Sequence, residues 1–178
     1  QLGSIMGSGG MIVMDADNNM VDVARFYMEF CMEESCGKCI PCREGLRCSL
    51  DVLTRITEGK GEEGDMALLE EMGGVMQDAC LCALGSSAPN PVISTLRYFR
   101  DEYDAHVRDH RCPAGVCKAL ITYEIDQAKC DGCHACVTAC STGAITGQVK
   151  YPHLLNQDLC IKCGACVDAC KREAVLRA

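Results

Sequence analysis

The sequence predicts an α+β chain in which a small helical bundle is followed by a compact, internally duplicated domain with short strands. Apolar residues recur at helical spacing over much of residues 20–110. Two short runs, at residues 122–125 and 144–146, have the composition of strands. Cysteine accounts for 17 of the 178 residues, and the cysteines after residue 129 recur with a fixed period, which indicates a duplication.

Four helices are expected in the bundle. Their apolar positions define the segments Val21–Glu34, Glu44–Glu58, Met66–Gln77 and a longer one from Pro89 to Tyr103. The Gly-rich turn at residues 59–64 separates the second helix from the third, which Asp65 can cap. Residues 7–14 predict a loop followed by a strand, and residues 111–121 connect the bundle to the duplicated domain.

Composition and charge exclude several classes of protein. The chain has 17 Lys and Arg against 25 Asp and Glu, a formal net charge of −8, which disfavours a nucleic-acid backbone as partner. No apolar run approaches the length of a membrane helix and no signal peptide is visible, so we expect a cytoplasmic protein with reduced thiols. Because the number of cysteines is odd, a complete set of internal disulfides is impossible.

The C-terminal cysteines form two matched runs of the spacing Cys-x2-Cys-x2-Cys-x3-Cys, and each position recurs 30 residues later. In two-cluster ferredoxins with this spacing, the fourth cysteine of each run ligates the other cluster. We therefore expect one [4Fe–4S] cluster on Cys130, Cys133, Cys136 and Cys170, and another on Cys160, Cys163, Cys166 and Cys140. A zinc ribbon or a disulfide knot fits less well, because zinc sites normally use two pairs of ligands.

A third cysteine run lies at the start of a predicted helix. Cys36-x2-Cys39-x2-Cys42 supplies three thiolates for a further [4Fe–4S] cluster in the bundle. The fourth ligand must come from far along the chain, where both Cys80 and Cys82 are available. Spacing alone does not choose between these two cysteines.

The run Glu34-Ser-Cys-Gly-Lys-Cys-Ile-Pro-Cys-Arg-Glu-Gly45 resembles the cluster motif of the NADH-binding flavoprotein subunit of respiratory complex I and its relatives. Gly7 to Asp15 resembles the segment before the cluster-bearing helices there, so residues 1–19 are expected to end a β-rich, ubiquitin-like domain. With the appended two-cluster domain, the chain is similar to the C-terminal part of the β subunit of electron-bifurcating [FeFe]-hydrogenases, NADP-reducing hydrogenases and NAD-dependent formate dehydrogenases. The resemblance implies Cys82 as the fourth ligand in the bundle.

The resemblance also implies cofactors and partners of the longer protein. FMN and NAD(P) are expected in an N-terminal domain that this chain lacks, since no Gly-rich nucleotide fingerprint precedes a helix here. The expected partners are an [FeFe]-hydrogenase-type catalytic subunit, a thioredoxin-like [2Fe–2S] subunit and ferredoxin, in an anaerobic host. Nucleic acid and a transmembrane segment are not expected.

Histidine and cysteine also gather near the junction of the two halves. The candidate ligands of a zinc ion are His106, Cys112 and Cys117. The resemblance implies zinc at this junction, with a fourth ligand where this chain has Asn18-Asn19. The other candidates for the fourth ligand are Cys48, Cys80 and His153. The alternative is that the two cysteines are reduced structural thiols and the histidine lies at a solvated helix end.

No sequence pattern resembles a catalytic acid, base or nucleophile. We therefore expect the electron-transfer segment of a flavin- and NAD(P)-dependent oxidoreductase complex, which relays single electrons between flavin, ferredoxin and a hydrogenase-type subunit in electron bifurcation. Residues 111–121 are expected to let the two-cluster domain swing. The alternative is a free-standing iron–sulfur carrier or redox sensor, although a carrier has no need of the extra docking surface that the helices supply.

Overall fold

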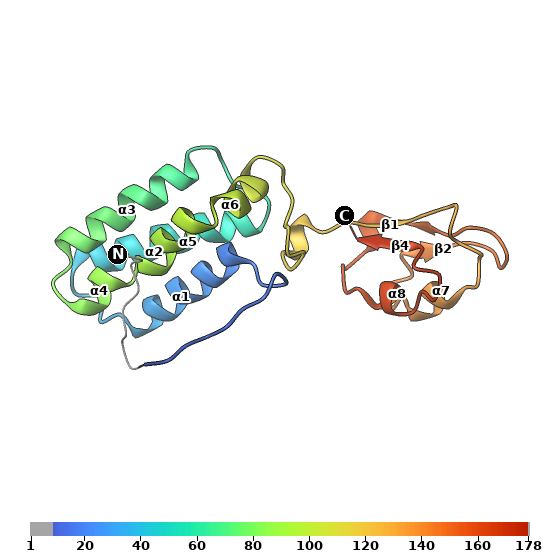
Figure 1. Ribbon diagram of the computed structural model, residues 1–178, viewed down its shortest axis with the longest axis horizontal. Helices are drawn as coiled ribbons and strands as arrows, with labels where there is room; N and C mark the ends of the chain where they lie inside the picture. The colour runs from blue at the N-terminus through green and yellow to red at the C-terminus, as the bar shows by residue number, and fades with distance from the viewer. Residues whose placement is uncertain (1–8, 178) are drawn as a thin grey trace. The chain divides into compact units, whose positions relative to one another are not determined.

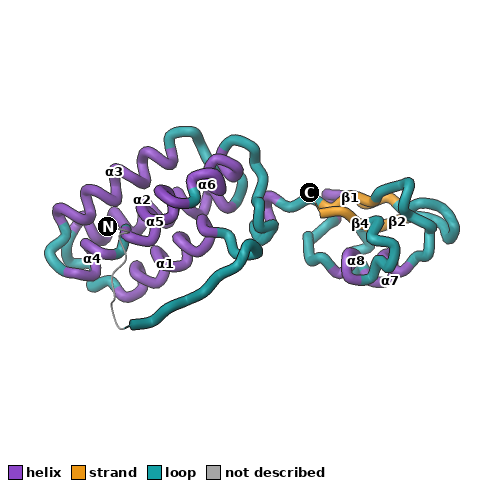
Figure 2. Tube along the Cα trace, viewed as in Figure 1, coloured by secondary structure: helices purple, strands orange, loops and turns teal. Residues whose placement is uncertain are grey.

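Two compact units make up the computed structural model, which describes residues 9–177. The helical unit is Gln1–Leu120 and the duplicated unit is Ile121–Ala178. Figure 1 and Figure 2 show the longer helices in the first of these and short strands with two short helices in the second. The chain is therefore rich in helix with small sheets, as the sequence predicts.

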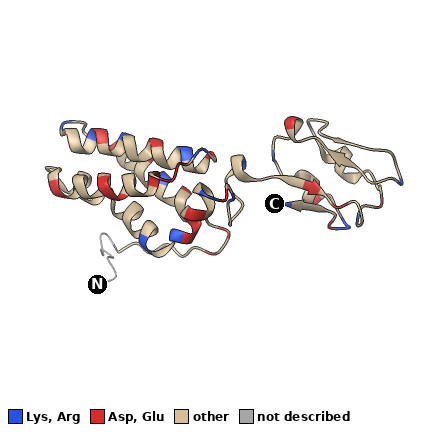
Figure 3. Cartoon of the chain, turned by 90° about the horizontal axis from the view of Figure 1, so that it is seen from above, with Lys and Arg blue, Asp and Glu red and all other residues tan. Residues whose placement is uncertain are grey.

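Six α-helices form the helical unit within the described residues. They are α1 (Met20–Glu34), α2 (Ile40–Thr57), α3 (Asp65–Ala79), α4 (Ala83–Ser87), α5 (Asn90–Tyr98) and α6 (Arg100–Val107), followed by the 3-10 turn η1 (Lys118–Leu120). Helix α2 packs between α1 and α3, and α5 contacts both α1 and α3. Figure 3 shows that both acidic and basic residues are distributed along these helices.

The boundaries of these helices differ from the prediction in three places. Helix α2 begins at Ile40 rather than Glu44, because Pro41 is well suited to the first turn of a helix and Cys39 is the N-cap. The long helix expected from Pro89 is interrupted at Phe99, whose φ of −131° and ψ of 38° separate α5 from α6. Helix α4 has only five residues, too few for a periodic apolar pattern to be recognised.

One apolar core holds the helical unit together. Fully buried side chains from different helices include Met28 of α1, Leu53 of α2, Leu69 of α3 and Leu96 of α5. An ion pair between the half-buried Arg55 and the buried Asp65 supplements the core where α2 ends and α3 begins. Arg55 Nε donates to Asp65 Oδ2 at 2.9 Å, and the same carboxylate oxygen accepts the backbone N–H of residue 62 at 2.9 Å.

The duplicated unit is built from two interlocked repeats. Its elements are β1 (Tyr123–Ile125), α7 (Ala135–Ala139), β2 (Ile145–Thr146), β3 (Leu154–Leu155), the 3-10 turn η2 (Gln157–Leu159), α8 (Ala165–Asp168) and β4 (Val175–Arg177). Strand β1 pairs antiparallel with β4, with Glu124 opposite Leu176, and β2 pairs antiparallel with β3, with Ile145 opposite Leu155. Each two-stranded sheet thus takes one strand from each repeat. Strands β3 and β4 have two and three residues and were not predicted.

The segment before α1 contains no strand among its described residues, 9–19. Met11, Ile12 and Val13 are 86%, 68% and 84% exposed, although the sequence predicts a strand here. A strand requires a neighbour for its backbone hydrogen bonds, and no described segment pairs with this one. The first part of the expected loop, residues 7–8, lies outside the described residues. Within residues 9–177, none of the helices combines the length and the apolar character that crossing a bilayer requires.

Candidate metal centres

Two cavities in the duplicated unit are each lined by four cysteines. The first is lined by Cys130, Cys133, Cys136 and Cys170, and the second by Cys140, Cys160, Cys163 and Cys166. These are the two ligand sets that the spacing predicts, with three thiols from one repeat and the fourth from the other. The remaining lining includes apolar side chains such as Val175 in the first cavity and Ile145 in the second. Four sulfur donors around a small cavity suit an iron–sulfur cluster.

Left-handed backbone turns bring the first three cysteines of each run together. In the first run Gly132 has a φ of 71° and His134 a φ of 70°, and in the second Lys162 has 57° and Gly164 has 81°. A short helix starts directly after each turn, α7 after the first and α8 after the second. The third cysteine of each run is buried in the first turn of that helix.

The fourth cysteine of each run receives hydrogen bonds that favour its thiolate. The hydroxyl of Thr142 lies 3.5 Å from Cys140 Sγ and lowers the pKa of that thiol. For Cys170, burial alone would raise the pKa, but the backbone N–H of Ala174, 3.3 Å from the sulfur, contributes to a pKa that is lowered on balance. Thiolates are the form of cysteine that ligates metal.

A third group of thiols lies in the helical unit at the start of α2. The sulfur atoms of Cys39, Cys42 and Cys80 lie within 4.8 Å of one another, whereas Cys36 and Cys82 are exposed. The structure therefore brings together two of the three cysteines of this run with one of the two candidates for the fourth ligand. Cys82 follows two residues later, as the N-cap of α4.

Glycine allows α4 to lie directly against this group of thiols. A Cβ atom at Gly85 would lie 2.7 Å from Cys80 Sγ and 3.2 Å from Cys42 Cβ, too close for any side chain there without a shift. Burial, together with the charges of Cys39 and Cys42, raises the pKa of Cys80 to about 11. The backbone N–H of Leu81 is the main cause of the lowered pKa of Cys39.

The loop between Cys36 and Cys39 is fixed by two side chains next to the cysteines. Arg43 Nη1 donates to the carbonyl oxygen of Gly37 at 2.8 Å, and Ser35 Oγ accepts the Gly37 N–H at 3.2 Å. The same Ser35 hydroxyl lies 3.3 Å from Cys42 Sγ. In the sequence, the only sign of this arrangement is Ser35 directly before the cysteine run and Arg43 directly after it.

The three candidate zinc ligands converge in the helical unit. His106, Cys112 and Cys117 are all buried, and their ligand atoms lie within 4.8 Å of one another. His106 Nδ1 lies 2.7 Å from the carbonyl oxygen of Glu102 and therefore carries the proton, which leaves Nε2 with the lone pair that a metal requires. Burial lowers the pKa of His106 and raises the pKa of Cys117.

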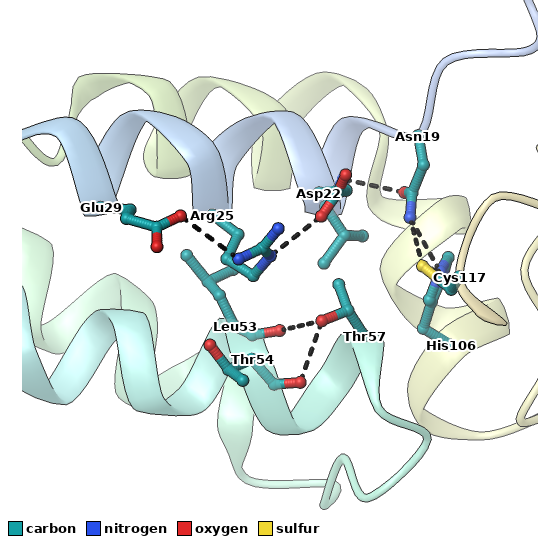
Figure 4. A network of polar contacts seen from close by, with 10 residues as sticks. Asn19, Asp22, Arg25, Glu29, Leu53, Thr54, Thr57, His106 and Cys117 are labelled. Atoms are coloured by element: carbon teal, nitrogen blue, oxygen red, sulfur yellow. Dashed lines mark hydrogen bonds and ion pairs between the residues drawn. The ribbon is translucent and has the colours of Figure 1, made fainter. Parts of the chain in front are cut away.

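Asn19 points toward two members of this group, His106 and Cys117, as Figure 4 shows. Its Nδ2 lies 3.0 Å from Cys117 Sγ and 3.1 Å from His106 Nε2, and its Oδ1 accepts the N–H of Val21 at 3.0 Å, so that it caps α1. Of the other candidates for a fourth ligand, Cys48 lies on α2, Cys80 lies beside Cys39, and His153 is in the duplicated unit. An amide nitrogen donates hydrogen bonds and is not a metal ligand, so three of the four positions carry protein donors that suit zinc.

Comparison with known proteins identifies both units. The family model of the NADH-ubiquinone oxidoreductase-F iron–sulfur binding region matches residues 22–106, and that of the 4Fe-4S dicluster domain matches residues 129–175. Each unit of the chain therefore matches an iron–sulfur family model. The expected resemblance to complex I flavoprotein relatives is thereby confirmed.

The similar proteins are subunits of redox complexes. The HndC subunit of the NADP-reducing hydrogenase of Solidesulfovibrio fructosivorans is 51% identical over 150 residues, which cover 84% of this chain and 31% of the relative. The F 2 subunit of the NADH-quinone oxidoreductase of Rhizobium meliloti (strain 1021) is 44% identical over 111 residues, 62% of this chain and 26% of the relative. The crystal structure of an NAD+-reducing [NiFe]-hydrogenase in the H2-reduced state matches 55% of this chain and 17% of its own chain, with a TM-score of 0.52 and 31% identity. The chain thus spans about a third or less of the curated relatives it matches.

Proposed function

We propose that this chain is the electron-transfer segment of a larger NAD(P)-linked oxidoreductase, with three [4Fe–4S] clusters. The observation that carries the proposal is the grouping of the cysteines into two cavities with four thiols each and a third group beside α2. A bound [4Fe–4S] cluster accepts and releases single electrons. The role of the chain is to hold the thiolates, exclude water with apolar lining and set the surroundings of the sulfur atoms.

The proposed ligands in the duplicated unit are Cys130, Cys133, Cys136 and Cys170 for one cluster, and Cys140, Cys160, Cys163 and Cys166 for the other. In the helical unit they are Cys36, Cys39, Cys42 and Cys82. Cys80 competes for the last position, because its sulfur lies with those of Cys39 and Cys42. Cys82 is proposed on the sequence context Cys82-Ala-Leu-Gly85, which resembles the phrase that holds the fourth ligand in the family. The close contacts of Gly85 itself are with Cys80 and Cys42.

The names of the relatives support a wider assembly. They include subunits of an NADP-reducing hydrogenase and of an NADH-quinone oxidoreductase, which bring NAD(P) chemistry into the proposal. We propose that FMN and NAD(P) are bound by another part of the longer protein and that the partners include ferredoxin and a hydrogenase-type subunit. In such an assembly this segment would connect the flavin to those partners, in electron bifurcation as the finer hypothesis.

The first experiment is an anaerobic count of iron and acid-labile sulfide on the purified chain. About twelve of each per chain are expected for three clusters. Cys82→Ala should lose about four iron atoms, whereas Cys80→Ala should keep the full count. The reverse pattern would assign the fourth ligand to Cys80, and a chain without iron would contradict the proposed function.

The role in electron transfer is tested in the complete complex with Cys133→Ala. This substitution should leave NADH-driven dye reduction unchanged and abolish electron exchange with ferredoxin, because only the duplicated unit is altered. Unchanged exchange with ferredoxin would contradict the relay.

We also propose that His106, Cys112 and Cys117 hold a zinc ion with three protein ligands. The support is their burial, their convergence and the proton on Nδ1 of His106, which leaves a lone pair on Nε2, where the amide of Asn19 lies at 3.1 Å. Asn19→Cys should add a third thiolate as the fourth ligand and slow the loss of zinc to a chelator, whereas Cys112→Ser should abolish zinc binding. Zinc analysis of the wild-type chain that finds no zinc contradicts this part of the proposal.

A further inference from the structure

A buried histidine touches one of the two cysteine-lined cavities of the duplicated unit. His153 is 0% exposed, and its Nδ1 lies 3.8 Å from the sulfur of Cys130. When Cys130 ligates a cluster it is a thiolate and can only accept a hydrogen bond, so Nδ1 of His153 carries the proton and donates.

A second histidine fixes this arrangement from the other side of the ring. His134 Nδ1 lies 3.0 Å from His153 Nε2, and with the proton of His153 on Nδ1 this Nε2 accepts from His134. His134 has a φ of 70°, in the left-handed region that residues other than glycine seldom adopt. The equivalent position in the second repeat, 30 residues later, is Gly164 with a φ of 81°. The first repeat therefore has an imidazole at a position where the backbone favours glycine.

The second cavity has tyrosine where the first has histidine. Tyr123 and His153 are 30 residues apart, the period of the duplication, and their surroundings are equivalent. Gln157 Nε2 donates to the carbonyl of Tyr123 at 2.6 Å, and Gln127 Nε2, 30 residues before Gln157, donates to the carbonyl of His153 at 2.9 Å. Tyr123 lines the second cavity as His153 lines the first.

The backbone leaves a fitted space for the histidine ring. A Cβ atom at Gly147 would lie 2.6 Å from Cδ2 of His153, so that only glycine permits the ring to pack there. The second cavity has a different donor, the hydroxyl of Thr142 next to Cys140, and at the position equivalent to Thr142 the first cavity has Arg172, paired with Asp131 at 2.8 Å. Hydrogen bonds to cluster sulfurs raise the reduction potential. The two cavities therefore differ in a contact that affects the potential of the cluster.

We infer that His153 is a positioning residue for the redox properties of the duplicated unit: its hydrogen bond to Cys130, held by His134, raises the reduction potential of the cluster in the first cavity and so separates the potentials of the two repeats. This inference rests on the proposed function, because it requires a cluster on Cys130. His153 contacts the ligand and not the iron, so its effect passes through the sulfur of Cys130.

The test is a potentiometric titration of the full chain, followed by EPR at one fixed pH. His153→Tyr, which copies Tyr123, should lower one midpoint so that the oxidised-to-reduced ratio at a fixed potential rises about tenfold, or about 59 mV for one electron. His134→Gly, which copies Gly164, should shift the same midpoint in the same direction by a smaller factor. His153→Asn, whose amide nitrogen can occupy the place of Nδ1, should keep most of the wild-type potential.

Tyr123→His is the matched control in the other repeat and should leave the His153-dependent midpoint unchanged. Iron and sulfide counts are taken on every variant. Full counts with all midpoints unmoved in His153→Tyr and His134→Gly would overturn the role of His153 while leaving the proposed function intact. Equal shifts in His153→Tyr and His153→Asn would show a packing effect and overturn it as well. A wild-type chain without iron would instead refute the proposed function. If His153→Tyr fails to fold, His134→Gly alone decides, because its backbone suits glycine.

Discussion

The helical unit and the duplicated unit are each stabilised by a different kind of core. The core of the helical unit consists of buried aliphatic, methionine and tyrosine side chains from several helices, and Cys42 is the one proposed cluster ligand among its buried described residues. The hydrophobic core of the duplicated unit is much smaller. It consists of Ile121, Tyr123, Ile145, Val175 and two proposed ligands, Cys136 and Cys166. Two proposed ligands of the duplicated unit, Cys136 and Cys166, are therefore part of its core.

Cluster binding and folding are consequently coupled to different degrees in the two halves. A two-stranded sheet is at best marginally stable alone in water, and the described part of the duplicated unit has only two such sheets. Metal binding to cysteines that cannot otherwise form a core adds directly to the free energy of folding. The helical unit has its own apolar core and should keep its helices without iron.

The largest expected effect is the loss of structure in the duplicated unit when iron is removed. Chelation under reducing conditions should abolish amide-exchange protection of strands β1 to β4, because their ligand-containing core is lost. Peptides from α5, which contains no proposed ligand, should keep their protection and serve as the internal control. Hydrogen exchange with mass spectrometry measures both at once, and persistent protection of β1 and β4 in the apo chain would contradict the comparison.

Next in size is a cavity in the core of the helical unit. Leu53 is 0% exposed, and Leu53→Ala should lower the free energy of unfolding of that unit by about 2–5 kcal/mol through lost burial and the remaining cavity. The iron content of the duplicated unit should not change. Val75, which is 46% exposed on α3, provides the control, since Val75→Ala should change stability by less than about 1 kcal/mol. Denaturant titration followed by circular dichroism measures the free energy of unfolding of both variants. Equal losses in Leu53→Ala and Val75→Ala would show that this core is not the main source of stability.

A smaller effect concerns acid stability of the helical unit. Burial alone would raise the pKa of Asp65, but its hydrogen bonds to Arg55 and the N–H of residue 62 lower it on balance. A lowered folded pKa gives stability that is present above the unfolded value of about 3.9 and is lost as the pH falls through the folded pKa. Asp65→Asn should cost about 1–3 kcal/mol at pH 7 and remove this acid dependence. Asp51→Asn, at an exposed carboxylate, is the control. If Asp65→Asn keeps the wild-type dependence of stability on pH, Asp65 is not the source of the acid dependence.

The smallest effect is at the cap of α1. Asn19→Ala removes the side-chain acceptor of the Val21 N–H and should cost about 1 kcal/mol of unfolding free energy. Asn18→Ala changes the exposed neighbour, whose side chain contacts Asp15, and should have a smaller effect. Thermal unfolding of both variants measures the difference. Equal melting temperatures would mean that the cap contributes nothing measurable.

Local sequence was sufficient to predict most of the helices of the helical unit and its family resemblance. Periodic apolar residues located α1 and α3 to within a few residues, because helices are specified by contacts three and four positions apart. The break at Phe99 was not visible, since the sequence around it keeps its helical spacing. Strands β3 and β4 were missed because two or three residues carry no alternation.

The order of residues along the chain predicts the two sets of four cysteines in the duplicated unit, because Cys-x2-Cys-x2-Cys spacing is a local property and the 30-residue period is visible in the chain. In the helical unit the spacing left Cys80 and Cys82 open, and the folded chain brings Cys80 next to Cys39 and Cys42. What lies next to those thiols became known from the folded molecule. Asn19 meets His106 and Cys117 across 87 and 98 residues, and His153 meets Cys130 across 23. Such contacts depend on how separate elements pack, and the spacing of residues along a chain does not encode which side chains packing brings together.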